Sequence, residues 1–261
     1  MDREDGRARR PARLNRDEVK VSGFHAVLAI FDRREEDIVK VYVTQERVYP
    51  FSDPLRRLAS TKRAYHIVDA EELERVSGTE HHEGVCAIVR RRPRMSPSEL
   101  LARLQDTRGP VDLLVLDGVE NPHNIGAVMR VAAHFGAPAI LVDHLAGEAG
   151  IPHAMYRTAE GGAEHVEVVE VGNIREALLH LKRAGFLVVA TSSHVEQNLY
   201  QGAWPTRVAW VLGGEHDGIS EEVAEVVDTA VAIPGTGNVE SLNVATATAI
   251  ILAEARRSRM H

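Results

Sequence analysis

Three loops of this sequence combine glycines with polar side chains that could act on a ligand. They are DGVENPHNIG, GGEHDGIS and PGTGNVESLN, and each follows a short apolar run that predicts a strand. Glycine lets a backbone approach a ligand closely, and free amides at a helix start can donate hydrogen bonds to it. The loops therefore predict a ligand site, although their composition alone does not name the ligand.

Asn124 and Arg130 are the candidates in the first loop and in the helix that follows it. The pattern predicts a helix over about 125–135, which Asn124 caps and Gly136 ends. Arg130 lies near its second turn, and the flat fork of guanidinium donors suits a phosphate or a carboxylate. The alternative is an ordinary capping asparagine and a solvent-exposed arginine.

Glu215 is the candidate in the second loop. Gly213, Gly214 and Gly218 leave little side-chain bulk around it, and a helix opened by acidic residues follows. A carboxylate there could hold loop amides or a substrate hydroxyl. A surface glutamate without such a task is the alternative.

Ser241 and Asn243 are the candidates in the third loop. They stand one residue apart near a helix start, so either could cap the helix while the other projects into a site. Gly235 and Gly237 form G-x-G, but Glu240 stands where a dinucleotide fingerprint has its third glycine. This gap weakens a nicotinamide oxidoreductase interpretation.

Other catalytic and metal-binding patterns are missing from the sequence. Cys86 is the single cysteine, which excludes an internal disulfide and favours a reducing compartment. The 13 histidines form neither H-E-x-x-H nor a paired Cys/His spacing, so we expect no metal. The G-x-S-x-G elbow and the G-x-x-x-x-G-K phosphate loop are also missing, which argues against hydrolase and triphosphatase functions.

Net charge and hydropathy narrow the partners and the location. A formal charge of −7 argues against coating nucleic acid by bulk electrostatics, but it leaves room for local basic faces. Three basic clusters are candidates: Arg3, Arg7, Arg9, Arg10 and Arg13; Arg56, Arg57, Lys62 and Arg63; and Arg90, Arg91, Arg92 and Arg94. The chain has no apolar run of about 18 residues and begins with charged residues, so we expect a cytoplasmic protein without a membrane partner.

The elements that must position the three loops form two predicted domains. We expect a flexible basic arm over 1–20, a small α/β domain over 21–91 and a linker over 92–110. In that linker, Ser96, Pro97 and Glu99 predict a helix with a capping box. From 111 to 261, apolar strands alternate with amphipathic helices, which predicts a mostly parallel sheet covered on both faces. Ligands bind such sheets beyond the carboxyl ends of the strands, where the three loops lie.

In this order, three segments resemble the motifs of the SpoU/TrmH class of SPOUT RNA methyltransferases: NIGAVMRVAAHFGA, VLGGEHDGIS and IPGTGNVESLNVATATAIILAE. The resemblance covers about residues 111–257. The segment from GFHAVLAIF to HHEGVCAIV is similar to the ribosomal-protein-like substrate-binding domain of the same family. The sequence looks closest to a tRNA/rRNA methyltransferase subgroup with the HHEGVC signature.

The resemblance implies a function and a fold beyond what the patterns predict. It implies transfer of a methyl group from S-adenosyl-L-methionine to a ribose 2′-oxygen in tRNA or rRNA. It also implies a homodimer and a trefoil knot in the 111–261 domain, whereas the patterns alone predict an unknotted doubly wound sheet. DNA and membranes are not expected as partners.

By position, the resemblance also assigns roles to individual residues. The implied catalytic residues are Asn124, Arg130, Glu215, Ser241 and Asn243. The implied cofactor-binding residues are Thr191, Ser192, Leu212, Gly213, Gly214, Glu215, Gly218, Ile233, Ser241 and Leu242. Arg130 stands where the family has its proposed base. Because a guanidinium is almost always protonated, our hypothesis is that Arg130 orients a phosphate and stabilises the developing oxyanion, with proton removal left open.

Three residues depart from the family pattern, and two other functions are alternatives to the one that the resemblance implies. Glu83 stands where relatives often have glutamine, His216 follows Glu215 in place of a small residue, and Gly235 replaces a common methionine. The first could alter the choice of RNA, and the other two could reshape the cofactor loop. The alternatives are a non-catalytic RNA-binding or assembly protein that retains a cofactor-binding knot, and the nicotinamide oxidoreductase.

Overall fold

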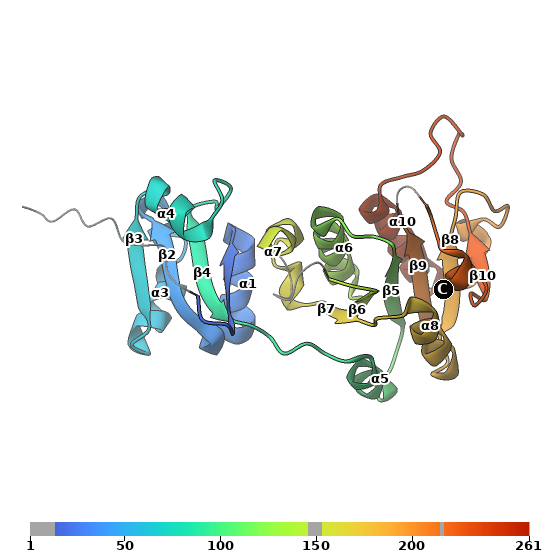
Figure 1. Cartoon of the computed structure of the whole chain (residues 1–261), viewed down its shortest axis with the longest axis horizontal. Helices are drawn as coiled ribbons and strands as arrows, with labels where there is room; N and C mark the ends of the chain where they lie inside the picture. The colour runs from blue at the N-terminus through green and yellow to red at the C-terminus, as the bar shows by residue number, and fades with distance from the viewer. Residues whose placement is uncertain (1–13, 146–152, 215–216, 261) are drawn as a thin grey trace, which may run out of the picture. The chain divides into compact units, whose positions relative to one another are not determined.

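The chain divides into two compact units, and the boundary between them along the sequence lies between Arg91 and Arg92. The computed structural model describes residues 14–145, 153–214 and 217–260, and each unit is considered by itself (Figure 1). Within these ranges, no helix has both the length and the apolar character needed to cross a membrane.

The smaller unit is a four-stranded mixed sheet with helices packed against it. Its strand order is β1 (Glu18–Ser22), β4 (Val85–Arg90), β2 (Ile38–Thr44), β3 (Ala64–Val68). β4 runs antiparallel to both of its neighbours, while β2 and β3 are parallel. Its α-helices are α1 (Phe24–Arg34), α2 (Gln45–Val48), α3 (Ser52–Ser60) and α4 (Ala70–Ser77).

The start of this unit differs from the expected arm over 1–20, because β1 already begins at Glu18. Val19 and Val21 are buried, and β1 pairs along its length with β4. Polar and apolar residues alternate in β1, but only over five residues that directly follow a charged stretch. Pairing with β4, which is distant in the sequence, therefore forms a strand from residues whose local composition does not predict one.

Glu83, one of the departures from the family pattern, has a structural task in this unit. Its carboxylate Oε2 accepts a hydrogen bond of 2.7 Å from the backbone N–H of Phe24, the first residue of α1. An acidic group at this position also suits the positive end of the helix dipole. Glu83 thus caps α1 from a backbone conformation with φ of +51°.

The larger unit contains a six-stranded, entirely parallel sheet, as the sequence predicts. Its strand order is β10 (Thr229–Val231), β8 (Leu187–Thr191), β9 (Arg207–Gly213), β5 (Val111–Asp117), β6 (Ala139–Val142), β7 (Glu167–Glu170). Its α-helices are α5 (Pro97–Gln105), α6 (Pro122–Phe135), α7 (His153–Ala159), α8 (Ile174–Arg183), α9 (Glu221–Ala224) and α10 (Val244–Ser258).

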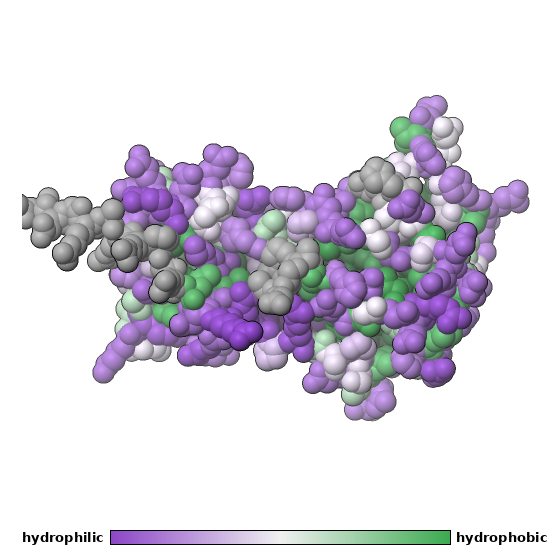
Figure 2. Space-filling model, viewed as in Figure 1, coloured by the Kyte–Doolittle hydropathy of each residue, from purple (hydrophilic) through white to green (hydrophobic). Residues whose placement is uncertain are grey.

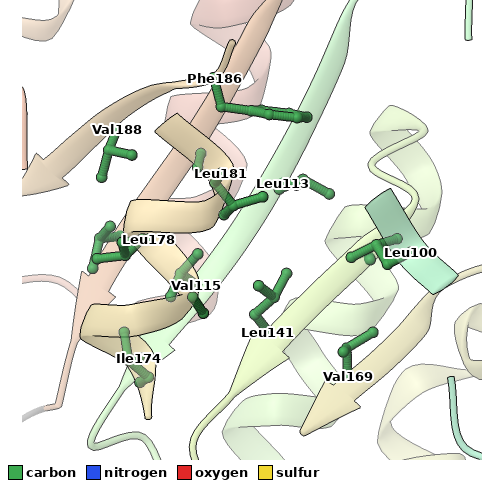
Figure 3. Close-up of a cluster of buried hydrophobic side chains, with 14 of the residues drawn as sticks. Leu100, Leu113, Val115, Leu141, Val169, Ile174, Leu178, Leu181, Phe186 and Val188 are labelled. Carbon is green, nitrogen blue, oxygen red and sulfur yellow. The ribbon is translucent and has the colours of Figure 1, made fainter. Parts of the chain in front are cut away.

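Helices cover both faces of this sheet (Figure 1). On one face, Leu178 and Leu181 of α8 pack over Leu113 and Val115 of β5, with Leu100 of α5 beside them (Figure 3). On the other face, α6 packs against both α7 and α10. The continuous apolar strands predict this double cover, because both faces of each strand must be buried.

α5 lies in the stretch 92–110, which was expected to be a linker. The predicted capping box is present: Ser96 Oγ accepts from Glu99 N, and the Glu99 carboxylate accepts from Ser96 N. Leu100 and Leu104 are buried in the core of the larger unit. This stretch is therefore part of that unit, because the apolar stripe of α5 needs a surface to cover it.

Candidate active site

The carboxyl ends of all six parallel strands lie along one edge of the larger sheet. The loops after β5, β9 and β10 contain the three polar segments identified in the sequence, and the turn after β8 contains Ser192. Parallel strands therefore bring together segments that lie far apart in the sequence. This edge is the candidate site.

Helix α6 begins three residues earlier than expected, so Asn124 is not its cap. The side chain of Asn121 accepts a hydrogen bond of 2.9 Å from His123 N, and Pro122 occupies the first helical position. Proline is well suited to that position because its missing N–H would have no partner there. Asn124 is thus freed from capping and lies in the first turn of α6.

Asn243 joins the third segment to the first. Its Oδ1 accepts a hydrogen bond of 3.0 Å from Ala245 N and so caps α10. Its Nδ2 donates across 119 residues of sequence to Oδ1 of Asn124, at 3.2 Å. Asn243 therefore both caps a helix and lies in the candidate site, while Ser241 is exposed two residues before it.

Arg130 lies apart from this pair of asparagines. Six residues along an α-helix correspond to about 9 Å of rise and roughly two-thirds of a turn of net rotation. Its guanidinium Nη1 lies 3.2 Å from Oε1 of Glu160, with the two side chains 61% and 36% exposed. The structure thus brings Asn124 and Asn243 together and places Arg130 elsewhere on the same helix, beside Glu160.

The glycines of the second segment are required by close backbone packing. A Cβ on Gly213 would lie 2.2 Å from the carbonyl carbon of Gly218, and one on Gly214 would lie 2.8 Å from the oxygen of Gly118. Gly214 and Gly218 also exchange two backbone hydrogen bonds of 3.1 Å. Glu215 and His216, between them, lie outside the described residues.

Asp117, at the end of β5, holds this glycine segment from the neighbouring loop. Its Oδ2 accepts a hydrogen bond of 2.7 Å from Ser220 N, at the start of α9. Asp117 was not among the predicted site residues. The available signal was an acidic residue at the carboxyl end of a buried strand, where it opens the segment DGVENPHNIG.

Thr191 and Ser192 already have backbone partners in the structure. The Thr191 hydroxyl donates to the carbonyl of Val211 at 3.1 Å, and the Ser192 hydroxyl accepts from His194 N at 3.1 Å. These contacts tie the end of β8 to β9 and close a local turn. Their implied role in binding a cofactor stays a prediction.

The loop between β10 and α10 stands out from the rest of the larger unit, and apolar atoms lie at its tip (Figures 1 and 2). Val239 is 72% exposed and Leu242 is 44% exposed. Gly237 has φ of +81°, and Gly235 has open space around it. An apolar, glycine-containing loop at this edge is available to a ligand or to another protein surface.

Most of the described arginines in the basic clusters have acidic partners. Arg57 and Arg63 both bind Glu35, and Arg56 binds Asp53. In the third cluster, Arg92 lies 3.4 Å from Glu167, and Arg94 binds Glu170. These pairs reduce the free positive charge of both clusters, while Arg3 to Arg13 lie outside the described residues.

Two family models match this chain in the order of its two units. The model of the RNA 2′-O ribose methyltransferase substrate-binding domain matches residues 20–95. The model of the SpoU rRNA Methylase family matches residues 113–253, which include all three segments of the candidate site.

Curated relatives match most of this chain. It is 38% identical over 244 residues to the Uncharacterized tRNA/rRNA methyltransferase YfiF of Escherichia coli O157:H7, covering 93% of this chain and 69% of that protein. It is 36% identical over 239 residues to the 23S rRNA (guanosine-2′-O-)-methyltransferase RlmB of Ralstonia nicotianae, covering 91% of this chain and 94% of that protein. The chain thus spans about two thirds of the YfiF relative and nearly all of RlmB.

Solved structures agree with these matches. One, described as an RNA 2′-O ribose methyltransferase, has a TM-score of 0.76 and 25% identity, covering 94% of this chain and 90% of the other. The SpoU methyltransferase AviRb from Streptomyces viridochromogenes, in complex with AdoMet, has a TM-score of 0.73 at 22% identity, covering 94% and 91%, and shows the same fold. With both regions matched in order, the resemblance is confirmed: this chain belongs to the SpoU family of S-adenosylmethionine-dependent RNA methyltransferases.

Proposed function

We propose that this protein transfers a methyl group from S-adenosylmethionine to the 2′-oxygen of a ribose in ribosomal or transfer RNA. The hydrogen bond between Asn243 and Asn124 carries the proposal, because it joins the first and third family segments at the carboxyl edge of the sheet. Ribosomal RNA is the first substrate to test, since the RlmB relatives are named for 23S rRNA. DNA is not a substrate, because it lacks the 2′-hydroxyl.

The residues at the sheet edge fit S-adenosylmethionine. Gly213 and Gly214 leave the end of β9 without side-chain cover, although the N–H and C=O of Gly214 already pair with Gly218. Leu242 offers an exposed apolar surface. We assign the cofactor to these residues together with Ile233, Ser192 and the other residues named from the resemblance. When bound, the cofactor supplies a methyl group on a positively charged sulfur.

Arg130 acts on the RNA in this proposal. Its guanidinium contacts a phosphate and stabilises negative charge that develops on the ribose oxygen. Asn124 and Asn243 hold the starts of α6 and α10 together at the edge where the ribose must enter. The small unit, which matches the substrate-binding model, holds the RNA.

Incubation with labelled S-adenosylmethionine and bulk rRNA or tRNA tests the proposal. We expect incorporation by the unaltered protein, and loss of at least about 100-fold in rate in Arg130→Ala, the scale for removing a group that stabilises a developing oxyanion. Cofactor affinity, measured by calorimetry, should be nearly unchanged. An equal loss of cofactor binding would make Arg130 a structural residue. Tight RNA binding without incorporation by the unaltered protein would instead support a non-catalytic RNA-binding protein.

The protein also acts as a cytoplasmic homodimer in this proposal. The exposed Val239 and Leu242 in the loop before α10 support it, because apolar side chains on a projecting loop favour a second protein surface. Cell fractionation checks the location. The trefoil knot remains a prediction of the resemblance, and a crystallographic trace of the path of α10 checks it.

A further inference from the structure

We propose that Glu160 is a positioning residue that orients the guanidinium of Arg130. This inference rests on the proposed function, in which Arg130 contacts the RNA. The first observation is the ion pair, in which Nη1 of Arg130 lies 3.2 Å from Oε1 of Glu160. Glu160 immediately follows α7, on the segment that packs along α6.

The backbone of Glu160 has a conformation that its side chain disfavours. Its φ is +46°, in the left-handed region that favours glycine. A glycine at position 160 would adopt the same backbone conformation without this strain, because it has no Cβ. Strain of this kind persists where the surrounding structure imposes it, and it gathers at functional sites.

Close packing fixes Glu160 relative to the backbone of Arg130. A Cβ on Gly162 would lie 2.9 Å from the carbonyl oxygen of Met129 and 3.1 Å from Cα of Arg130. One turn earlier on α6, a Cβ on Gly126 would lie 2.9 Å from the carbonyl oxygen of Met155. α6 and the segment from α7 to Gly162 thus touch backbone to backbone, which fixes the backbone of Glu160 relative to that of Arg130.

The ion pair reduces the entropic cost of ligand binding by an exposed arginine. The Arg130 side chain is 61% exposed and would otherwise lose much rotamer freedom when it contacts a ligand. The ion pair with Glu160 restrains the Arg130 side chain before the ligand arrives. A guanidinium has five N–H donors, so donors remain for a phosphate or an oxyanion. Glu160 acts on the RNA only through Arg130.

A double-mutant cycle on the full-length protein tests this. Glu160→Gln keeps the size of the side chain and removes its charge, so we expect kcat to fall about two- to fivefold, the effect of one exposed ion pair, with little change in KM. Cofactor affinity and thermal unfolding should stay unchanged. Glu160→Gly should lower kcat similarly while raising the unfolding temperature, because it relieves the strain. In Arg130→Ala, which removes the partner of Glu160, Glu160→Gln should have no further effect on the residual rate.

Glu225→Gln is the matched control, since it removes the same charge from an exposed residue at the end of α9. Its kcat should equal that of the unaltered protein. Unchanged kcat in Glu160→Gln, a rise in kcat, or equal effects in both Arg130 backgrounds would each overturn the positioning role alone. If the unaltered protein transfers no methyl group to any RNA, the proposed function fails, and the positioning role fails with it.

Discussion

At the scale of single residues, the candidate site depends on side chains with two tasks each. Asn243 caps α10 with its oxygen and reaches Asn124 with its nitrogen. From the sequence, capping and participation in the site were alternatives for this residue. An amide side chain has both an acceptor and donors, so a single asparagine can do both.

Asp228 also makes several contacts, and these give a prediction about pH. Its carboxylate lies 2.8 Å from Nζ of Lys182 and accepts a hydrogen bond of 2.9 Å from Val188 N. Burial raises its pKa, but the hydrogen bonds from Lys182 and Val188 and the charge of Lys182 outweigh burial and lower the pKa below its ordinary value. Its stabilising effect is therefore full above the unfolded-state pKa of about 4 and is lost as the pH falls through the lower folded-state value.

Asp228→Asn should lower the free energy of unfolding by about 1 kcal/mol at pH 7, since the group is partly exposed. The difference from the unaltered protein should shrink progressively below about pH 4. Urea unfolding followed by tryptophan fluorescence measures it, because both tryptophans, Trp204 and Trp210, lie in the larger unit. Asp106→Asn, at an exposed helix end, is the control; a pH-independent difference would contradict the assignment.

At the scale of elements, we expect the edge strand β3 and the residue after the short helix α2 to contact RNA, because both carry exposed tyrosines. Tyr49, directly after α2, is 87% exposed, and Tyr65 of β3 is 39% exposed. The nearby arginines of the second basic cluster bind Glu35 and Asp53 and have less free charge to offer. Exposed aromatic rings can stack on unpaired bases, which is a common means of holding RNA.

Tyr49→Ala and Tyr65→Ala should each weaken RNA binding by about 1–3 kcal/mol, the range for loss of one stacked base. Cofactor affinity should not change, because the cofactor residues lie in the other unit. Fluorescence anisotropy with labelled rRNA fragments measures the effect. Tyr49→Phe and Tyr65→Phe keep the rings and should bind as the unaltered protein does, whereas unchanged binding in both alanine variants would place the RNA elsewhere.

At the scale of the whole molecule, two units with separate sheets divide the proposed work between RNA binding and methyl transfer. The loop from β10 to α10 adds a third feature, an exposed apolar surface next to the candidate site. If the protein dimerises through this loop, sedimentation equilibrium should give twice the mass of the chain at micromolar concentration. Val239→Asp should shift the protein toward the monomer, because it places a charge in an apolar contact.

Ile67→Asp makes the same kind of change at an exposed position of β3, in the smaller unit, and should leave the mass unchanged. A monomer at all concentrations would contradict the homodimer. A dimer that both substitutions leave intact would contradict the loop as the dimer contact, but it would agree with the homodimer itself.

The sequence was sufficient to predict the fold class, the family and the loops that form the candidate site. Alternating apolar strands and amphipathic helices predicted the parallel sheet, and Ser96 with Glu99 predicted a capping box that the structure contains. These patterns extend over a few neighbouring residues, so they can be recognised without a structure. The resemblance carried by the three segments supplied the cofactor and the reaction.

The tertiary structure alone decided which residues meet. It moved the start of α6 to Pro122, paired Asn124 with Asn243, and placed Glu160 against Arg130. It also showed that β1 and α5 belong to the packed units, although their stretches were expected to be an arm and a linker. Such contacts join segments far apart in the chain, and they depend on how backbones pack at Gly162 and Gly213, which no local pattern records.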